Sequence, residues 1–174
     1  GSVDEVNSLH LPDPNRVAYL TQTTLSLDET RDIIDALKKK YPKVQGPAAQ
    51  DICYATENRQ TAVKHIVNDV DLLLVVGSDN SSNSKRLVEV ARDFGRSSHL
   101  IENYKAILPE WLEGVNSVAL TAGASAPEIL VEEVVEFLRG KGFTDLQEVE
   151  VMPENVRFGL PPEIVEAIAA APAN

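Results

Sequence analysis

Three loops rich in hydroxyl and amide side chains hold the groups in this chain that could bind an anion. They are Thr21–Ser26, Gly77–Arg86 and Thr121–Ala126, and each follows an apolar stretch and precedes an amphipathic one. Hydroxyl, amide and backbone N–H groups all donate hydrogen bonds to phosphate oxygens, and a helix N-terminus adds a favourable dipole. The residue types therefore indicate a site where neutral donors hold a phosphate-like group.

A purely structural reading stays open for each loop, because Ser, Thr and Asn are also ordinary helix N-caps. Ser26 and Ser125 each precede a glutamate by three residues, which is capping-box spacing. Capping is the favoured role for Ser26, whereas Ser125 could cap a helix and still contact a ligand. Only one of four consecutive polar residues is needed as a cap in the middle loop, so the surplus favours ligand binding there: Ser81, Ser82, Asn83 and Ser84.

Cys53 is the single cysteine, and it lies between a predicted loop and a helix expected to begin by about Asn58. A lone cysteine is most often a small buried hydrophobe, but a thiolate near a helix N-terminus is stabilised and can react or bind metal. Both roles remain open on these grounds. The three histidines form no spaced metal motif, and His65 is expected on a helix surface. Neither a Walker sequence nor a GxGxxG pattern is present, so the glycines do not support nucleotide binding.

The elements that must position these loops are strands alternating with helices, which predicts a parallel sheet. The continuously apolar run Leu72–Val76 is typical of a strand covered on both faces. The other expected strands are Val17–Leu20, Ser98–Ile101 and Val118–Leu120. Expected helices are Leu27–Lys40, a segment ending near Gly95, a short helix at Pro109–Leu112, and one with Pro127 in its first turn that ends at Gly140 or Gly142. The binding edge of such a sheet lies beyond the strand C-termini, where all three loops fall.

Composition limits the classes of function. The 174 residues carry a formal net charge of −11, which argues against nucleic-acid binding. No apolar run reaches the roughly 20 residues of a membrane span, and no signal peptide is visible. One cysteine leaves no internal disulfide and fits a reducing compartment, so a cytoplasmic location is expected. Gly1-Ser2 resembles an expression-tag scar.

The four stretches TQTTLS, DICYAT-NRQ, VVGS-NSSNS-RL and TAGASAP, in this order and spacing, resemble the C-terminal half of the LytB/IspH family. Members of that family are 4-hydroxy-3-methylbut-2-enyl diphosphate reductases, which form isopentenyl and dimethylallyl diphosphate in the methylerythritol phosphate route. The resemblance implies α/β domains around a 4Fe-4S cluster held by one cysteine from each of three domains. It also implies a diphosphate substrate and an electron donor such as ferredoxin or flavodoxin.

Carried over residue by residue, the resemblance implies that Cys53 is a cluster ligand. It implies that Thr23 lies near the substrate hydroxyl and assists proton delivery, so Thr23 is the expected catalytic residue. The residues implied to bind the diphosphate are Ser81, Ser82, Asn83 and Ser125.

The chain departs from the family because the other cluster cysteines, the diphosphate-binding histidines and the acidic glutamate cannot be placed in it. We therefore expect a fragment, with residues 1–50 as part of one α/β domain, 51–145 as a complete α/β domain and 146–174 as an extended tail. The fold class is α/β, with parallel sheets flanked by helices. We expect no cluster and little activity in the chain by itself, and self-association through the incomplete domain. The alternative function is an α/β phosphate-binding module without redox chemistry.

Overall fold

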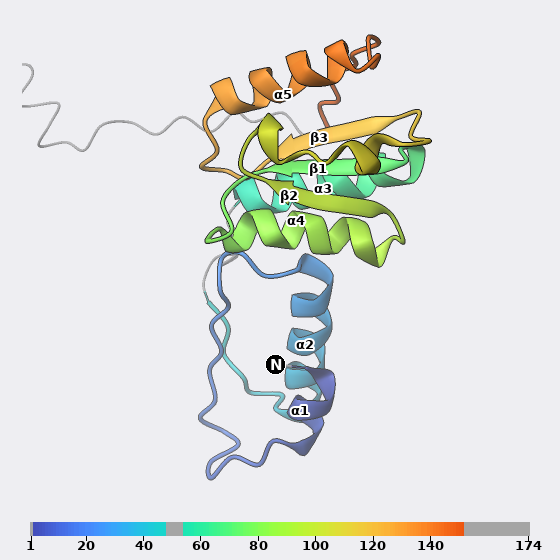
Figure 1. The fold of residues 1–174 in the computed structure, drawn as a ribbon. Coiled ribbons are helices and arrows are strands. Elements are labelled where there is room, and N and C mark those ends of the chain that lie inside the picture. Colours follow the sequence, from blue (N-terminus) through green and yellow to red (C-terminus); the bar gives the residue numbers. More distant parts are fainter. Residues whose placement is uncertain (1, 48–53, 152–174) are drawn as a thin grey trace, which may run out of the picture.

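The computed structural model describes residues 2–47 and 54–151 (Figure 1). Cys53, and the part of the predicted tail from residue 152 onward, lie outside the described residues. No helix among the described residues is long and apolar enough to cross a membrane.

A parallel sheet of three strands forms the centre of the larger part. β1 (Leu72–Val76) pairs with β2 (Ser97–Ile101) on one side and with β3 (Val118–Ala122) on the other, in the order β2-β1-β3. The register places Leu74 of β1 beside His99 and Leu120. All five residues of β1 are buried, as its unbroken apolar sequence predicts.

Helices cover both faces of this sheet (Figure 1). On one face α3 (Tyr54–Ile66) and α4 (Ser82–Asp93) pack on Leu73 and Val75, with the short η1 (Val67–Asp69) alongside. On the other face α5 (Glu128–Gly140), η2 (Tyr104–Ala106) and η3 (Pro109–Leu112) enclose the remaining β1 side chains. Because alternate residues of a strand point to opposite faces, β1 supplies both apolar clusters. The predicted α/β class is confirmed.

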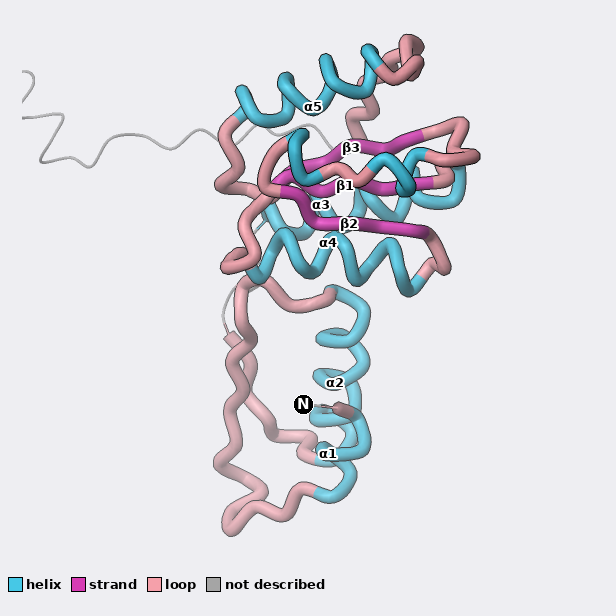
Figure 2. Tube along the Cα trace, in the orientation of Figure 1, coloured by secondary structure: helices cyan, strands magenta, loops and turns pink. Residues whose placement is uncertain are grey.

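The N-terminal part contains α1 (Val3–Ser8) and α2 (Leu27–Lys40), which pack side by side (Figure 2). Lys40 Nζ donates to the carbonyls of Val6 (3.0 Å) and Asn7 (2.6 Å), so the end of α2 is tied to the end of α1. The observed bounds of α2 match the prediction, and Ser26 is its N-cap, with Oγ 3.5 Å from the amide of Glu29.

The predicted strand at Val17–Leu20 is wrong. Its pairing is one isolated parallel bridge between Ala18 and Gln45. The amide of Tyr19 donates to Gln45 O and the amide of Gln45 donates to Val17 O, each at 2.9 Å. One bridge does not sustain a ladder, so this apolar segment stays irregular despite its strand-like composition.

Two other boundaries differ from the predictions, whereas α3, described from Tyr54, agrees with a helix expected by about Asn58. β3 continues through Ala122, because the pairing with β1 extends to Val76. Pro127 is the N-cap of α5 with extended backbone (φ −63°, ψ 134°), so it is not inside the first turn. The cap makes no side-chain hydrogen bond, and Ser125 therefore does not cap this helix.

The remaining helix and strand predictions hold closely. β2 includes the predicted Ser98–Ile101, and Pro109–Leu112 forms the predicted short helix as a 3-10 turn. α4 ends beside Gly95, whose φ of +73° is the left-handed conformation that favours glycine after a helix. Residues 143–150, which include the described start of the predicted tail, form neither helix nor strand.

Candidate anion-binding site at the strand C-termini

The loops after β1 and β3 leave the sheet side by side. The amide of Gly123 donates to Val76 O at 2.9 Å, and the amide of Gly77 donates to Ile101 O at 2.9 Å. These bonds continue the ladder one step beyond the strands and hold the starts of both loops at the same edge. Of the three polar loops predicted to lie beyond strand C-termini, these two do, whereas Thr21–Ser26 follows an isolated bridge and no strand.

The N-terminus of α4 lies at this edge and is capped by Ser81. Its Oγ accepts from the backbone amide of Ser84 at 3.2 Å and from the Ser84 hydroxyl at 2.9 Å. Ser82, the first helical residue, is exposed. Of the four polar residues Ser81–Ser84, Ser81 therefore serves as the N-cap, in agreement with the prediction that capping needs only one of them.

Asn83 is the residue of this group whose environment is hardest to explain without a ligand. Its side chain is only 7% exposed, yet neither Nδ2 nor Oδ1 has a hydrogen-bond partner among the described residues. Leaving a buried polar group unpaired costs roughly 1–3 kcal/mol. Such a group at a helix N-terminus, where the helix dipole already favours an anion, points to a bound molecule as its missing partner.

Ser125 lies in the loop between β3 and α5, at the same edge of the sheet. It is exposed and lines a cavity of about 200 Å³ together with Gly77, Ser78 and Glu102, while apolar residues complete the wall: Val76, Ala126, Pro127 and Leu130. Ser81, Ser82 and Asn83 are not part of this lining. The structure thus brings the predicted residues to one sheet edge as two neighbouring groups, and the carboxyl group of Glu102 borders the second.

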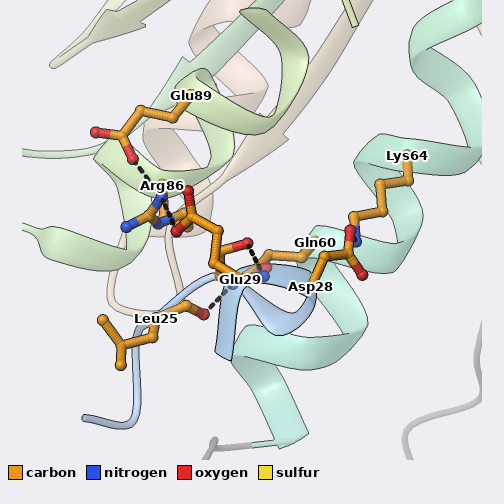
Figure 3. A network of polar contacts seen from close by, with 8 residues as sticks. Leu25, Asp28, Glu29, Gln60, Lys64, Arg86 and Glu89 are labelled. Atoms are coloured by element: carbon orange, nitrogen blue, oxygen red, sulfur yellow. Dashed lines mark hydrogen bonds and ion pairs between the residues drawn. The ribbon is translucent and has the colours of Figure 1, made fainter. Parts of the chain in front are cut away.

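Thr23 lies in a turn of the loop before α2 and is exposed. The loop is fastened to the sheet-containing part by the fully buried Gln60, whose Nε2 donates to Leu25 O at 2.9 Å (Figure 3). This anchor sets the position of the whole loop relative to α3. Among the described residues no hydrogen bond or ion pair joins Thr23 to Ser81 or Asn83, so its predicted role stays a prediction.

Two ion pairs reinforce this junction (Figure 3). Lys64 of α3 contacts Asp28 at 2.5 Å, and Arg86 of α4 contacts Glu29 at 3.4 Å. Arg86 also pairs with Glu89 of its own helix at 2.9 Å. The start of α2 is therefore held against both helices of one layer.

Arg59 lies at the same sheet edge, although the sequence patterns do not single it out. Its Nε donates to Ala122 O at 3.2 Å and its Nη1 to Ala55 O at 3.0 Å, which places a guanidinium at the C-terminal end of β3. In the sequence, Arg59 is marked only by its place in the stretch DICYAT-NRQ, which also contains Cys53. In a chain with net charge −11, a half-buried cation beside the polar loops makes that edge less negative.

The metal prediction rests on Cys53, which precedes the first residue of α3 in the sequence and lies outside the described residues. Within residues 2–47 and 54–151, no group of three or more His, Cys, Asp or Glu side chains could hold a metal ion. Iron–sulfur clusters are held by several thiolates, and this chain has one cysteine. The chain therefore supplies one thiolate at most to a cluster site.

Comparisons with known proteins agree with this architecture. A curated relative from Leifsonia xyli subsp. xyli, named 4-hydroxy-3-methylbut-2-enyl diphosphate reductase, is 47% identical over 169 residues, covering 97% of this chain and 50% of that protein. A relative from Bradyrhizobium diazoefficiens with the same activity in its name is 51% identical over 163 residues, covering 94% of this chain and 53% of that protein. The chain thus spans about half the length of these relatives.

A solved structure adds a three-dimensional match. The E-1-hydroxy-2-methyl-but-2-enyl-4-diphosphate reductase from Plasmodium falciparum superposes with a TM-score of 0.86 at 37% identity, over 97% of this chain and 54% of that one. A model of the LytB protein family matches residues 2–139. With motifs, fold and sequence in agreement, this chain belongs to the LytB family.

Proposed function

We propose that this chain is part of a 4-hydroxy-3-methylbut-2-enyl diphosphate reductase, an oxidoreductase of isoprenoid biosynthesis that removes the hydroxyl of an allylic diphosphate. The names of relatives at 47% and 51% identity support this. Their length supports a further proposal, that a complete enzyme needs about as many residues again as this chain supplies.

The observation that carries the proposal is the buried, unpaired amide of Asn83 at the N-terminus of α4. We propose that it binds the diphosphate together with Ser81, Ser82 and Ser125. A hydrogen bond to a charged group contributes about 1.5–3 kcal/mol, so several neutral donors can hold a diphosphate with few cations. This is consistent with the composition of the loops and with the guanidinium of Arg59 nearby.

Cys53 is proposed as one ligand of the iron–sulfur cluster, and Thr23 as the residue that delivers a proton at the substrate hydroxyl. When bound, the cluster supplies the electrons of the reduction. The other thiolates must come from outside this chain, because it has one cysteine. We propose that the chain is inactive alone.

The partners proposed for a complete assembly are an electron donor such as ferredoxin or flavodoxin and the polypeptide that completes the incomplete N-terminal domain. A second copy of this chain could pair with the exposed segment that ends at Leu20, whose side chain is 85% exposed. The domain boundaries 1–50, 51–145 and 146–174 remain part of this proposal.

The alternative is a phosphate-binding α/β module without redox chemistry, and the single cysteine favours it. Iron and sulfide content after anaerobic reconstitution, measured on the wild type and on Cys53→Ala, tests whether the chain by itself takes part in holding a cluster. A stoichiometric cluster in the wild type alone supports the reductase proposal and implies thiolates shared between chains. Iron in neither protein, with diphosphate still bound in calorimetry, means that the chain alone is catalytically incomplete and that diphosphate binding is its remaining function. Failure to bind diphosphate contradicts both.

A further inference from the structure

Ser84 occupies a confined position between the two loops. It is 1% exposed, and its side chain fills the space beside two glycines. A Cβ atom added at Gly77 would lie 2.3 Å from Ser84 Oγ, and one added at Gly123 would lie 2.1 Å from it. Any other residue at either glycine would collide with Ser84, so the three positions form one packed unit.

The hydroxyl of Ser84 acts on Ser81. Ser81 Oγ accepts from the backbone amide of Ser84 at 3.2 Å and from the Ser84 hydroxyl at 2.9 Å. A serine oxygen has two acceptor sites and one hydrogen. With both acceptor sites engaged by Ser84, the hydrogen of Ser81 is left to donate away from the helix.

We propose that Ser84 is a positioning residue for the anion site: it fixes and polarises the Ser81 hydroxyl so that this hydroxyl donates to the bound diphosphate. The inference rests on the proposed function, because it assigns the diphosphate as the acceptor. The unpaired amide of the neighbouring Asn83 is the independent sign that a ligand binds at this helix N-terminus.

Two effects set the expected size of the contribution. A hydroxyl rotor has three staggered positions, so fixing one contributes a factor of about three. Hydrogen bonds in a chain strengthen one another by perhaps 10–30%. Loss of the Ser84 hydroxyl should therefore reduce diphosphate affinity by roughly three- to tenfold, while Ser81 remains in place.

The test is a double-mutant cycle on the full chain, with inorganic diphosphate as the probe in isothermal titration calorimetry. The variants are Ser84→Ala, Ser81→Gly and the combination of the two. Glycine is chosen at position 81 because it is a much better N-cap than alanine and keeps α4 capped. The proposal predicts a roughly three- to tenfold loss for Ser84→Ala in the wild-type background and no further loss in the Ser81→Gly background.

The outcomes separate this inference from the proposed function. Equal losses in both backgrounds mean that Ser84 acts on packing and not through Ser81, which overturns the inference alone. Wild-type affinity in Ser84→Ala also overturns it alone. A wild-type chain that does not bind diphosphate overturns the inference and the proposed anion site together.

Unfolding temperatures of further variants test the packing around Ser84. Gly123→Ala should lower the unfolding temperature, because its methyl group collides with Ser84 Oγ. Adding Ser84→Gly should restore most of the loss by removing the hydroxymethyl group. A loss that persists in Gly123→Ala/Ser84→Gly would contradict the packing on which the inference depends.

Discussion

The Asn83 side chain combines burial with unpaired polar atoms, which is a stability cost in the ligand-free chain. Replacement by a side chain of similar size without polar atoms removes that cost. A residue kept for structure alone would behave in the opposite way, because its loss would destabilise the fold. The sign of one substitution therefore tells a ligand-binding role from a structural one.

We predict that Asn83→Leu raises the free energy of unfolding by about 1–2 kcal/mol without ligand and abolishes stabilisation by added diphosphate. Urea titrations of both proteins, with and without inorganic diphosphate, measure this. Ser82→Ala is the control at the adjacent exposed position, and its ligand-free stability should stay within about 0.5 kcal/mol of the wild type. A loss of stability in Asn83→Leu would assign the amide a structural role.

His99 on β2 stacks on Trp111 of η3, with ring centroids 3.7 Å apart and planes within 4°. Burial lowers the pKa of His99 below 6.5, and the charge of Arg92 lowers it further. The unfolded chain takes up a proton near the ordinary pKa, whereas the folded chain does so only at lower pH. The free energy of unfolding should therefore fall as the pH drops below about 6.5.

The single tryptophan reports this titration directly. Its fluorescence in the folded chain should change with a midpoint below the ordinary histidine pKa of about 6.5, and His99→Gln should remove the transition. His65→Gln, on the exposed face of α3, should leave it in place. A midpoint at or above the ordinary value would contradict the effect of burial.

At the scale of elements, Asp71 aligns the start of β3 with β1. Its carboxylate accepts from the amides of Asn116 (2.9 Å) and Ser117 (3.1 Å) and from the Ser117 hydroxyl (3.2 Å). Its own amide donates to Ser117 O at 3.1 Å. The turn before β3 is thereby fixed one residue before the ladder begins at Leu72 and Val118.

These hydrogen bonds, first from the Asn116 and Ser117 amides, lower the pKa of Asp71 below 3.8. The stabilisation is therefore complete at pH values above the ordinary pKa and is lost as the pH falls through the lower pKa of the folded chain. We predict that Asp71→Asn lowers the unfolding temperature near neutral pH and that the difference from wild type shrinks toward about pH 2. Asp93→Asn, at the exposed end of α4, is the control. A difference independent of pH would show that the charge is not involved.

At the scale of the whole molecule, the interactions that hold the loop carrying Thr23 include, among the described residues, a buried hydrogen bond and two exposed ion pairs. The bond from Gln60 to Leu25 O is shielded from water, whereas Asp28 and Glu29 are 63% and 66% exposed in their ion pairs. Exposed ion pairs contribute about 0–1 kcal/mol, while leaving a buried carbonyl unpaired costs about 1–3 kcal/mol. The hydrogen bond should dominate.

We predict that Gln60→Met speeds amide hydrogen exchange in α2 by about 5- to 150-fold, which corresponds to the range of roughly 1–3 kcal/mol. Lys64→Met is the matched control, because it removes an ion pair from the same helix with the same replacement. It should change exchange by about fivefold or less. If Lys64→Met speeds amide exchange in α2 more than Gln60→Met does, the ion pair and not the buried amide holds the loop.

Much of the secondary structure was predictable because its causes are local. The bounds of α2 follow from a capping serine and an apolar face, and those of β1 from five consecutive apolar residues. The strand predicted at Val17–Leu20 is absent because a strand needs a neighbouring partner, and among the described residues only Gln45 pairs with this segment. Ser125 does not cap α5, contrary to its capping-box spacing, because Pro127 has extended backbone and is itself the N-cap.

The sequence by itself determined the family, the α/β class, and the polar loops that follow the strands, since residue order and residue type carry that information. Only the tertiary structure decided the order β2-β1-β3, the burial of Asn83, and the insertion of Ser84 between Gly77 and Gly123. The physical reason is that each of these depends on contacts between segments that are distant in the chain. A serine that caps a helix and a serine that orients its neighbour look the same until the opposing backbone is in place.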